Sequence, residues 1–206
     1  MAASRDSSAV QALQIVPFFA DLPEEHATEM AKNLVSRRYA AGTAIFHLGD
    51  PGGLLYLIGK GKVKISHTTN EGQEVVLAIL GPGDFFGEMA LIDDAPRSAT
   101  AVALEASETW TLHREEFIHY LTDNPDFALH VLKTLAQHIR RLNAQLADIF
   151  FLDLPGRLAR TLLNLADQYG VYTTEGTIIS LSLTQTDLAE MTGATRVSIN
   201  KALGRF

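Results

Sequence analysis

Five residues in the middle of the chain have side chains and spacing that suit a ligand built from a sugar and a phosphate. Gly87 allows a ligand to approach the backbone closely, and the Glu88 carboxylate can accept hydrogen bonds from a pair of sugar hydroxyls. Arg97 brings a permanent positive charge and a forked set of donors that fits a phosphate. Ser98 adds a hydroxyl, and Ser98 and Ala99 add backbone N–H groups. The alternative is a surface ion pair between Glu88 and Arg97 across a loop.

The segment that carries these residues resembles the phosphate-binding cassette of the cyclic-nucleotide-binding fold. That cassette reads FGE-x-AL, a short spacer, then PR followed by a small residue and Ala; this chain has FGEMAL, four residues and PRSA. The resemblance implies that Gly87 and Glu88 bind the ribose 2′-hydroxyl. It also implies that Arg97 and Ser98 bind the cyclic phosphate, with the Ala99 N–H close by.

A second group of residues, near the end of the chain, has the spacing of a helix-turn-helix. A helix-turn-helix needs a small residue where its two helices touch, a glycine in the turn, and an apolar residue that packs the second helix against the first. Here these are Ala189, Gly193 and Ile199. Residues 195–206 carry three basic side chains and no acidic one, although the whole chain has a net charge of −7. A basic helix of this kind reads base edges and phosphates; the alternative is a solvated basic face.

Taken together, the two groups make the chain resemble the CRP/FNR family of bacterial transcription regulators from about Phe18 onward. The resemblance implies a regulator that binds cyclic AMP, or alternatively cyclic GMP, and responds by changing its DNA binding. The implied partners are a second copy of the chain, a near-palindromic operator DNA and RNA polymerase. The candidate DNA-contacting residues are Thr195, Arg196, Ser198 and Lys201.

Two departures from the family pattern affect the DNA-reading unit. Val197 stands where the best-known members carry a glutamate that accepts from cytosine, so we expect a different DNA site. In the family a two-stranded wing follows the recognition helix, but this sequence ends at Phe206, before such a segment. The sequence therefore predicts either a chain cut short before the wing or a reader that lacks this flank.

A long helix is predicted between the two groups by an apolar seam with alternating spacings of four and three. A seam of this kind predicts a parallel two-fold dimer. In the family this helix gives polar side chains to the nucleotide base, and Asn143 keeps an amide that could bond an adenine edge. Leu142 follows the apolar pattern instead and is expected to be a core residue. The apolar seam consists of Ala128, Leu132, Leu135, Ile139, Leu142, Leu146 and Ile149.

The remaining elements are predicted from the positions of glycines between apolar runs and from the spacing of apolar residues. Residues 10–40 have helical spacing, with a second helix starting near Pro23. Short apolar runs separated by glycines from residue 41 to about 113 predict a sandwich or barrel, with a hairpin turn at residues 70–72. If residues 89–92 form a helical turn, its N–H groups point towards an anion. The predicted fold class is α+β: a β-roll (jelly roll), a dimerisation helix and a helix-turn-helix of winged-helix type.

The C-terminal third has clear start and stop signals. Pro155-Gly156 predicts a break after Asp153, and Gly170 predicts the end of the following helix. Residues 177–181 are expected to form one strand. The segment from Thr184 to Asp187 has the pattern of a capping box, and Thr195 can cap a last helix. The predicted domains are a sensor (residues 1–125), a dimerisation helix and hinge (126–153) and a helix-turn-helix (154–206).

Composition limits the other classes of function. Hydrophobic residues make up 47% of the 206 residues, which is enough for a globular core, and no apolar run is long enough to span a membrane. We therefore expect a cytoplasmic protein. Without cysteine, and without HxH or HExxH motifs among seven histidines, no metal is expected. The chain is not expected to be an enzyme; the alternatives are a β-barrel enzyme, disfavoured because the cassette offers no nucleophile or base, and a regulator that senses another small molecule.

Overall fold

The structure, a computed structural model, describes residues 9–10, 13–14, 16, 19, 24–69, 71–181 and 183–206. The predictions that involve Phe18, Pro23 and Asn70 fall on residues outside this set. The chain divides into two compact units, Met1–Gln73 with Leu77–Gln137, and Glu74–Val76 with His138–Phe206. The domain boundaries given above stay a prediction.

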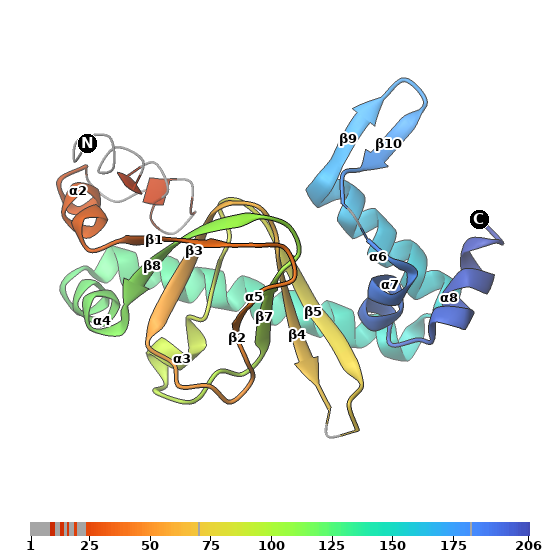
Figure 1. Cartoon of the computed structure of the whole chain (residues 1–206), viewed down its shortest axis with the longest axis horizontal. Helices are drawn as coiled ribbons and strands as arrows, with labels where there is room; N and C mark the ends of the chain where they lie inside the picture. The colour runs from red at the N-terminus through yellow and green to blue at the C-terminus, as the bar shows by residue number, and fades with distance from the viewer. Residues whose placement is uncertain are drawn as a thin grey trace. The chain divides into compact units, whose positions relative to one another are not determined.

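Two four-stranded antiparallel sheets, which belong to the first unit except for Glu74–Val76, confirm the predicted β-roll (Figure 1). One sheet has the order β1 (Val35–Tyr39), β8 (Ser107–His113), β3 (Leu54–Lys60) and β6 (Phe85–Phe86). The other has the order β2 (Ala44–Phe46), β7 (Thr100–Ala103), β4 (Val63–Thr68) and β5 (Glu74–Leu80). Strands β4 and β5 are neighbours in this sheet, and the Gly72 N–H donates to the Thr69 carbonyl at 2.9 Å between them.

Strand β3 is buried on both faces, which explains its unbroken apolar sequence. Leu55 and Leu57 face a core shared with the helices, whereas Tyr56 and Ile58 face a second core between the two sheets. A strand covered on both sides has no polar face, so its sequence does not alternate. The strand therefore links the two cores of the first unit.

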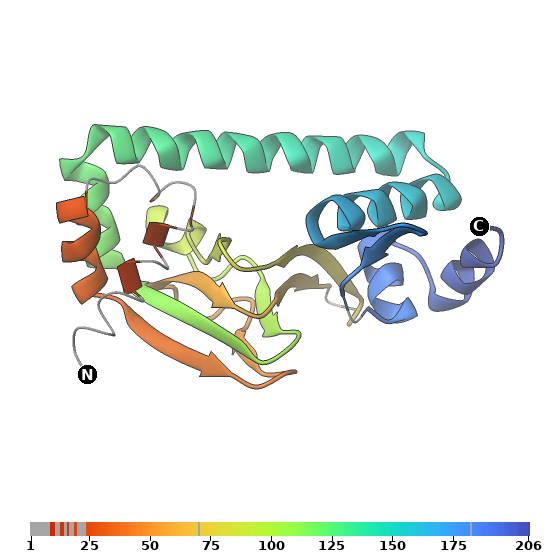
Figure 2. The same cartoon turned by 90° about the horizontal axis from the view of Figure 1, so that it is seen from above.

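Helices cover the outer face of the β1-β8-β3-β6 sheet. They are α2 (Glu24–Lys32), α4 (Arg114–Asp123) and the start of α5 (Pro125–Phe151) (Figure 2). Met30, Phe117 and Phe127 supply large buried side chains to this core. The short helix α3 (Met89–Ile92) confirms the helical turn predicted after Glu88.

The prediction that residues 10–40 are helical is wrong beyond α2. Residues 35–39 form β1, whose five residues pair in register with β8, starting with Val35 opposite Thr111. Pairing with residues 68 to 76 positions further along the chain overrides the local helical spacing, because sheet hydrogen bonds satisfy the backbone as well as a helix does. Val35 is accordingly exposed, not on a buried helical face.

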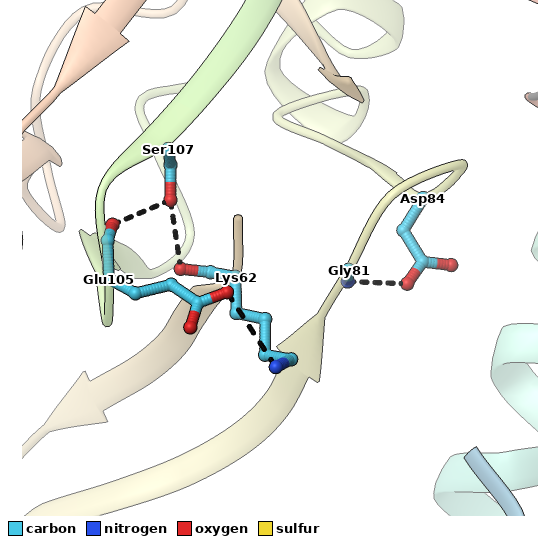
Figure 3. Close-up of polar contacts among 5 residues, drawn as sticks. All are labelled: Lys62, Gly81, Asp84, Glu105 and Ser107. Atoms are coloured by element: carbon cyan, nitrogen blue, oxygen red, sulfur yellow. Dashed lines mark hydrogen bonds and ion pairs between the residues drawn. The ribbon is translucent and has the colours of Figure 1, made fainter. Parts of the chain in front are cut away.

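Side chains hold several turns of the β-roll (Figure 3). The Ser107 hydroxyl donates to the carbonyls of Glu105 (2.8 Å) and Lys62 (3.3 Å), and Lys62 also forms a 3.6 Å ion pair with Glu105. Across the turn before β6, the Asp84 carboxylate accepts from the Gly81 N–H at 2.8 Å. These contacts fix the loops that connect the two sheets.

The second unit contains α6 (Leu154–Tyr169), a hairpin of β9 (Gly170–Thr173) and β10 (Gly176–Ile179), α7 (Gln185–Thr192) and α8 (Arg196–Leu203). The strand predicted at 177–181 is thus shorter, and its partner β9 was not predicted. Gly170 ends α6, as predicted, and directly begins β9. The core of this unit consists of Leu158, Leu165, Leu188, Ala189, Ile199 and Ala202, with partly buried neighbours.

The break between α5 and α6 lies earlier than the Pro155-Gly156 pair itself. Asp153 caps α6 by accepting from the Gly156 N–H at 2.9 Å, so Pro155 sits in the first helical turn, where its missing N–H costs nothing. Arg157 fastens this junction: it donates to the Leu152 carbonyl (3.0 Å) and to the Thr192 carbonyl at the end of α7 (3.1 Å).

Candidate functional site

The cassette is assembled where β6 leads into α3. Gly87 follows the strand with φ of +85°, a conformation that side chains disfavour. A Cβ at this position would lie 2.5 Å from Arg97 Nη1 and 3.1 Å from the Leu54 carbonyl oxygen. Glycine is therefore needed both for the backbone conformation and for the close approach of Arg97.

Arg97 is buried against the backbone and is only 4% exposed. Its Nη1 donates to the Gly87 carbonyl and its Nη2 to the Leu54 carbonyl, both at 2.8 Å. Its Nε is buried and has no hydrogen-bond partner. Burial lowers the pKa of Arg97, and Tyr56, Glu88 and Asp50 oppose that shift. A buried cation that lacks a full set of partners is suited to receive an anion.

Glu88 lies next to this cation without forming a surface ion pair. The residue is partly buried at the start of α3, and desolvation raises the pKa of its carboxyl above the ordinary 4.5, opposed by its own backbone N–H and by the charge of Arg97. Both hydrogen bonds of Arg97 go to backbone carbonyls, and its side chain is not at the surface. The structure therefore does not support the simple surface-pair alternative.

The structure places the other cassette residues as follows. Ser98 is exposed, and its hydroxyl contacts the Met89 sulfur at 3.6 Å; Ala99 is buried just before β7. Asn143 belongs to the second compact unit and has an exposed side chain on α5. Its contact with a ligand stays a prediction.

An aromatic cluster beneath Arg97 was missed by sequence reasoning. The ring of Phe46 lies 4.3 Å from the guanidinium carbon, and that of Tyr56 lies 5.6 Å from it. Phe86 stacks on Tyr56 with ring centroids 4.9 Å apart. We call Phe46, Tyr56 and Phe86 the aromatic platform. Its residues come from β2, β3 and β6, and no local sequence pattern indicates that these strands meet.

The helix-turn-helix is confirmed by its turn and its caps. The Thr184 hydroxyl accepts from the Asp187 N–H at 3.1 Å, and the Asp187 carboxylate accepts from the Thr184 N–H at 2.8 Å, which completes the predicted capping box. Gly193 has φ of +64° between α7 and α8. Ala189 and Ile199 are buried where the predicted helix contact requires them.

The exposed face of α8 carries the candidate DNA-contacting residues. Arg196 and Lys201 are exposed, and Val197 is 65% exposed between them. Thr195 caps the helix by accepting from the Ser198 N–H at 3.2 Å, and the two hydroxyls of Thr195 and Ser198 lie 2.9 Å apart. These two hydroxyls therefore already have partners within the helix start.

The part of the chain that the structure describes holds neither a cluster of metal ligands nor a membrane-spanning helix. Across residues 24–69, 71–181 and 183–206 and the few described before them, no three His, Cys, Asp or Glu residues gather as metal ligands would. None of the helices in the described part of the chain is long and apolar enough to cross a membrane.

Comparison with known proteins agrees with the geometry of both units. A cyclic nucleotide-binding domain model matches residues 36–124, and a Crp-like helix-turn-helix domain model matches residues 156–206. A CRP-like cAMP-activated global transcriptional regulator of Mycobacterium tuberculosis is 36% identical over 86% of this chain and 79% of its own.

Two solved structures are similar along most of the chain. The catabolite activator protein of Thermus thermophilus is 33% identical, covers 92% of this chain and 85% of its own, and has a TM-score of 0.59. The c-di-GMP responsive global regulator CLP of Xanthomonas campestris is 25% identical, covers 84% and 86%, and has a TM-score of 0.71. Both relatives thus share this order of elements, and the Xanthomonas protein is described as responsive to c-di-GMP.

Proposed function

Because the chain belongs to the CRP/FNR family of transcription regulators, we propose that cyclic AMP is its effector and controls the DNA binding of a homodimer. The matched domains make the chain a regulator with a cyclic-nucleotide-binding domain and a DNA-binding helix-turn-helix, not an enzyme. The identity of the nucleotide, the dimer and the response to the nucleotide are the parts that we propose.

The observation that carries the effector proposal is the state of Arg97. Its guanidinium is buried, its Nε has no partner, and its position is held by Gly87 and Leu54. A cyclic phosphate would supply both the missing acceptor and the opposite charge. We propose that Ser98 and the Ala99 N–H complete the phosphate site, that Gly87 and Glu88 hold the ribose hydroxyl, and that Asn143 contacts the adenine.

The apolar seam supports the proposed dimer. Five of its side chains (Leu132, Ile139, Leu142, Leu146 and Ile149) are between 54% and 61% exposed in the single chain. Leu142 is thus not a core residue of one chain, and it would become one only against a second copy. Isolated apolar side chains at a surface are ordinary, but a regular stripe along a 27-residue helix is typical of a coiled-coil interface.

For the output, we propose that α8 reads DNA through Thr195, Arg196, Ser198 and Lys201. A two-fold dimer presents two such helices, so the operator would be a near-palindrome with half-sites about 34 Å apart. Arg196 and Lys201 provide the exposed positive charge for base and phosphate contacts. RNA polymerase is the further partner that we propose.

Calorimetry with four ligands tests the effector. The ligands are cyclic AMP, cyclic GMP, cyclic di-GMP and AMP, and we expect the strongest binding for cyclic AMP, without turnover. Arg97→Gln should weaken that binding by at least about a hundredfold, because removing one partner of a buried charge pair costs ~3–5 kcal/mol. Preferred binding of cyclic di-GMP would favour a second candidate function, a regulator of the same family that responds to cyclic di-GMP, as the Xanthomonas relative is described to do. Unchanged affinity of Arg97→Gln for cyclic AMP would refute the site.

A further inference from the structure

Phe46 places an aromatic ring from one sheet against a cation that is anchored to the other. Arg97 donates to the backbone of Leu54, in β3, and of Gly87, directly after β6. Phe46 belongs to β2, in the opposite sheet, and its ring centroid lies 4.3 Å from the guanidinium carbon. The ring centroid of Phe46 lies 5.6 Å from that of Tyr56 and 5.8 Å from that of Phe86, so the other two rings of the aromatic platform hold it in place.

The hydrogen bonds of Arg97 leave one degree of freedom that this ring can remove. An arginine side chain has five N–H donors in one plane, and here the two hydrogen bonds use one on Nη1 and one on Nη2. Two such bonds fix one edge of the guanidinium, but the plane can still tilt about the line through these nitrogens. A ring face against the central carbon opposes that tilt, and the cation–π attraction is stronger where water is excluded.

We propose that Phe46 is a positioning residue of the phosphate site, which acts through Arg97. Its ring face holds the guanidinium so that the unused donors, including the buried Nε, keep the orientation that a cyclic phosphate requires. The proposal rests on the proposed function, and it names a residue outside the cassette as a determinant of phosphate affinity. Because Phe46 lies 51 positions before Arg97, the cassette motif does not include it.

Fluorinated phenylalanines at position 46 test the proposal in the full chain. Successive ring fluorines weaken the negative face of the ring while the shape changes little, so stability and packing are nearly preserved. We expect the affinity for cyclic AMP, measured by calorimetry, to fall stepwise with the number of fluorines. Phe46→Leu should lose about threefold to thirtyfold, and Phe46→Tyr should retain binding.

The matched control is the same fluorinated series at Phe86. This residue packs in the same platform, but Arg97 makes its cation–π contacts with Phe46 and Tyr56. The affinity of the Phe86 variants for cyclic AMP should not fall with the number of fluorines. In an Arg97→Gln background the series at position 46 should also lose its trend, which a merely structural role of the ring would not predict.

Three results would overturn the proposal. They are an unchanged affinity across the position 46 series, a tighter affinity on fluorination, and an equal trend at Phe86. Tighter binding would mean that the ring holds Arg97 away from the ligand. Failure of the parent chain to bind any cyclic nucleotide would be a different outcome, because it removes the proposed function and this inference with it.

Discussion

Substitution of Gly87 by alanine should disturb both the backbone conformation at this position and the close approach of Arg97. The residue has φ of +85°, so any side chain there costs ~1–2 kcal/mol of folding free energy. In addition, the new Cβ would lie 2.5 Å from Arg97 Nη1, a distance at which the guanidinium must move. Movement breaks the 2.8 Å hydrogen bond to the Gly87 carbonyl and changes the orientation of the cation.

Loss of that charge-assisted hydrogen bond sets the expected size of the effect. Such bonds contribute ~1.5–3 kcal/mol; if binding must supply this free energy to return the guanidinium to its position, the dissociation constant rises roughly tenfold to a hundredfold. We therefore expect Gly87→Ala to reduce the free energy of unfolding and also to weaken cyclic AMP binding by at least about tenfold. Urea unfolding and calorimetry measure the two quantities separately.

Gly42→Ala is the matched control. Gly42 has φ of +79°, but nothing lies within 4 Å of the position of its Cβ. It should lose a similar free energy of unfolding while its affinity for cyclic AMP stays unchanged. If the two variants bind cyclic AMP equally well, the close approach of Gly87 and Arg97 has no role in the site, and the reasoning is refuted.

Three further predictions concern the seam, Glu88 and the DNA response. Leu142→Asp should convert the dimer to a monomer in analytical ultracentrifugation, whereas Ala147→Asp, off the seam on the same helix, should not; a monomeric parent at micromolar concentration would contradict the dimer. Because desolvation raises the pKa of Glu88 and a ribose hydroxyl donates to its ionised form, affinity for cyclic AMP should fall as the pH is lowered through that raised value. Glu88→Gln should lack this part of the pH dependence in calorimetry, and an identical profile would argue against a ribose contact. Operator DNA selected from a random library should tighten cyclic AMP by the same factor by which cyclic AMP tightens DNA, and equal DNA affinity with and without the nucleotide would remove the switch.

The raised pKa of Glu88 has a consequence of opposite sign for folding. Between its unfolded pKa and its higher folded pKa, the folded chain binds more protons, so the free energy of unfolding decreases as the pH rises through this range. The carboxylate is thus a destabilising group at neutral pH in the ligand-free chain. The presence of Glu88 agrees with a role in binding, since binding sites commonly contain groups that folding alone would not favour.

Local signals predicted the parts of the molecule that depend on neighbours in sequence. The capping box at Thr184, the cap at Thr195 and the turn at Gly193 were all readable, because their partners lie within three or four residues. The cassette was recognised instead from its resemblance to a family motif, although Gly87 and Arg97 lie ten positions apart. The roles of its residues and of Asn143 stay proposals.

The features that were missed depend on contacts between distant segments. Strand β1 exists because β8 pairs with it, and the Leu54 carbonyl reaches Arg97 from 43 residues away. The strand that contains Phe46 could be recognised from the sequence. A three-residue strand, however, does not show which side chains of the opposite sheet its residues contact. Hairpin β9–β10 was only half predicted, because Gly170 was interpreted solely as a helix stop.

Arg157 has a mechanical consequence for the second unit. By donating to Leu152 in the link after α5 and to Thr192 at the end of α7, one rigid fork ties the helix junction to the entrance of the turn before α8. A rotation of α6 about the link at Asp153 would stretch one of these two hydrogen bonds. A rotation at the end of α5 would therefore be passed on to α7. The two hydrogen bonds of Arg157 therefore stiffen the two-residue link between α5 and α6.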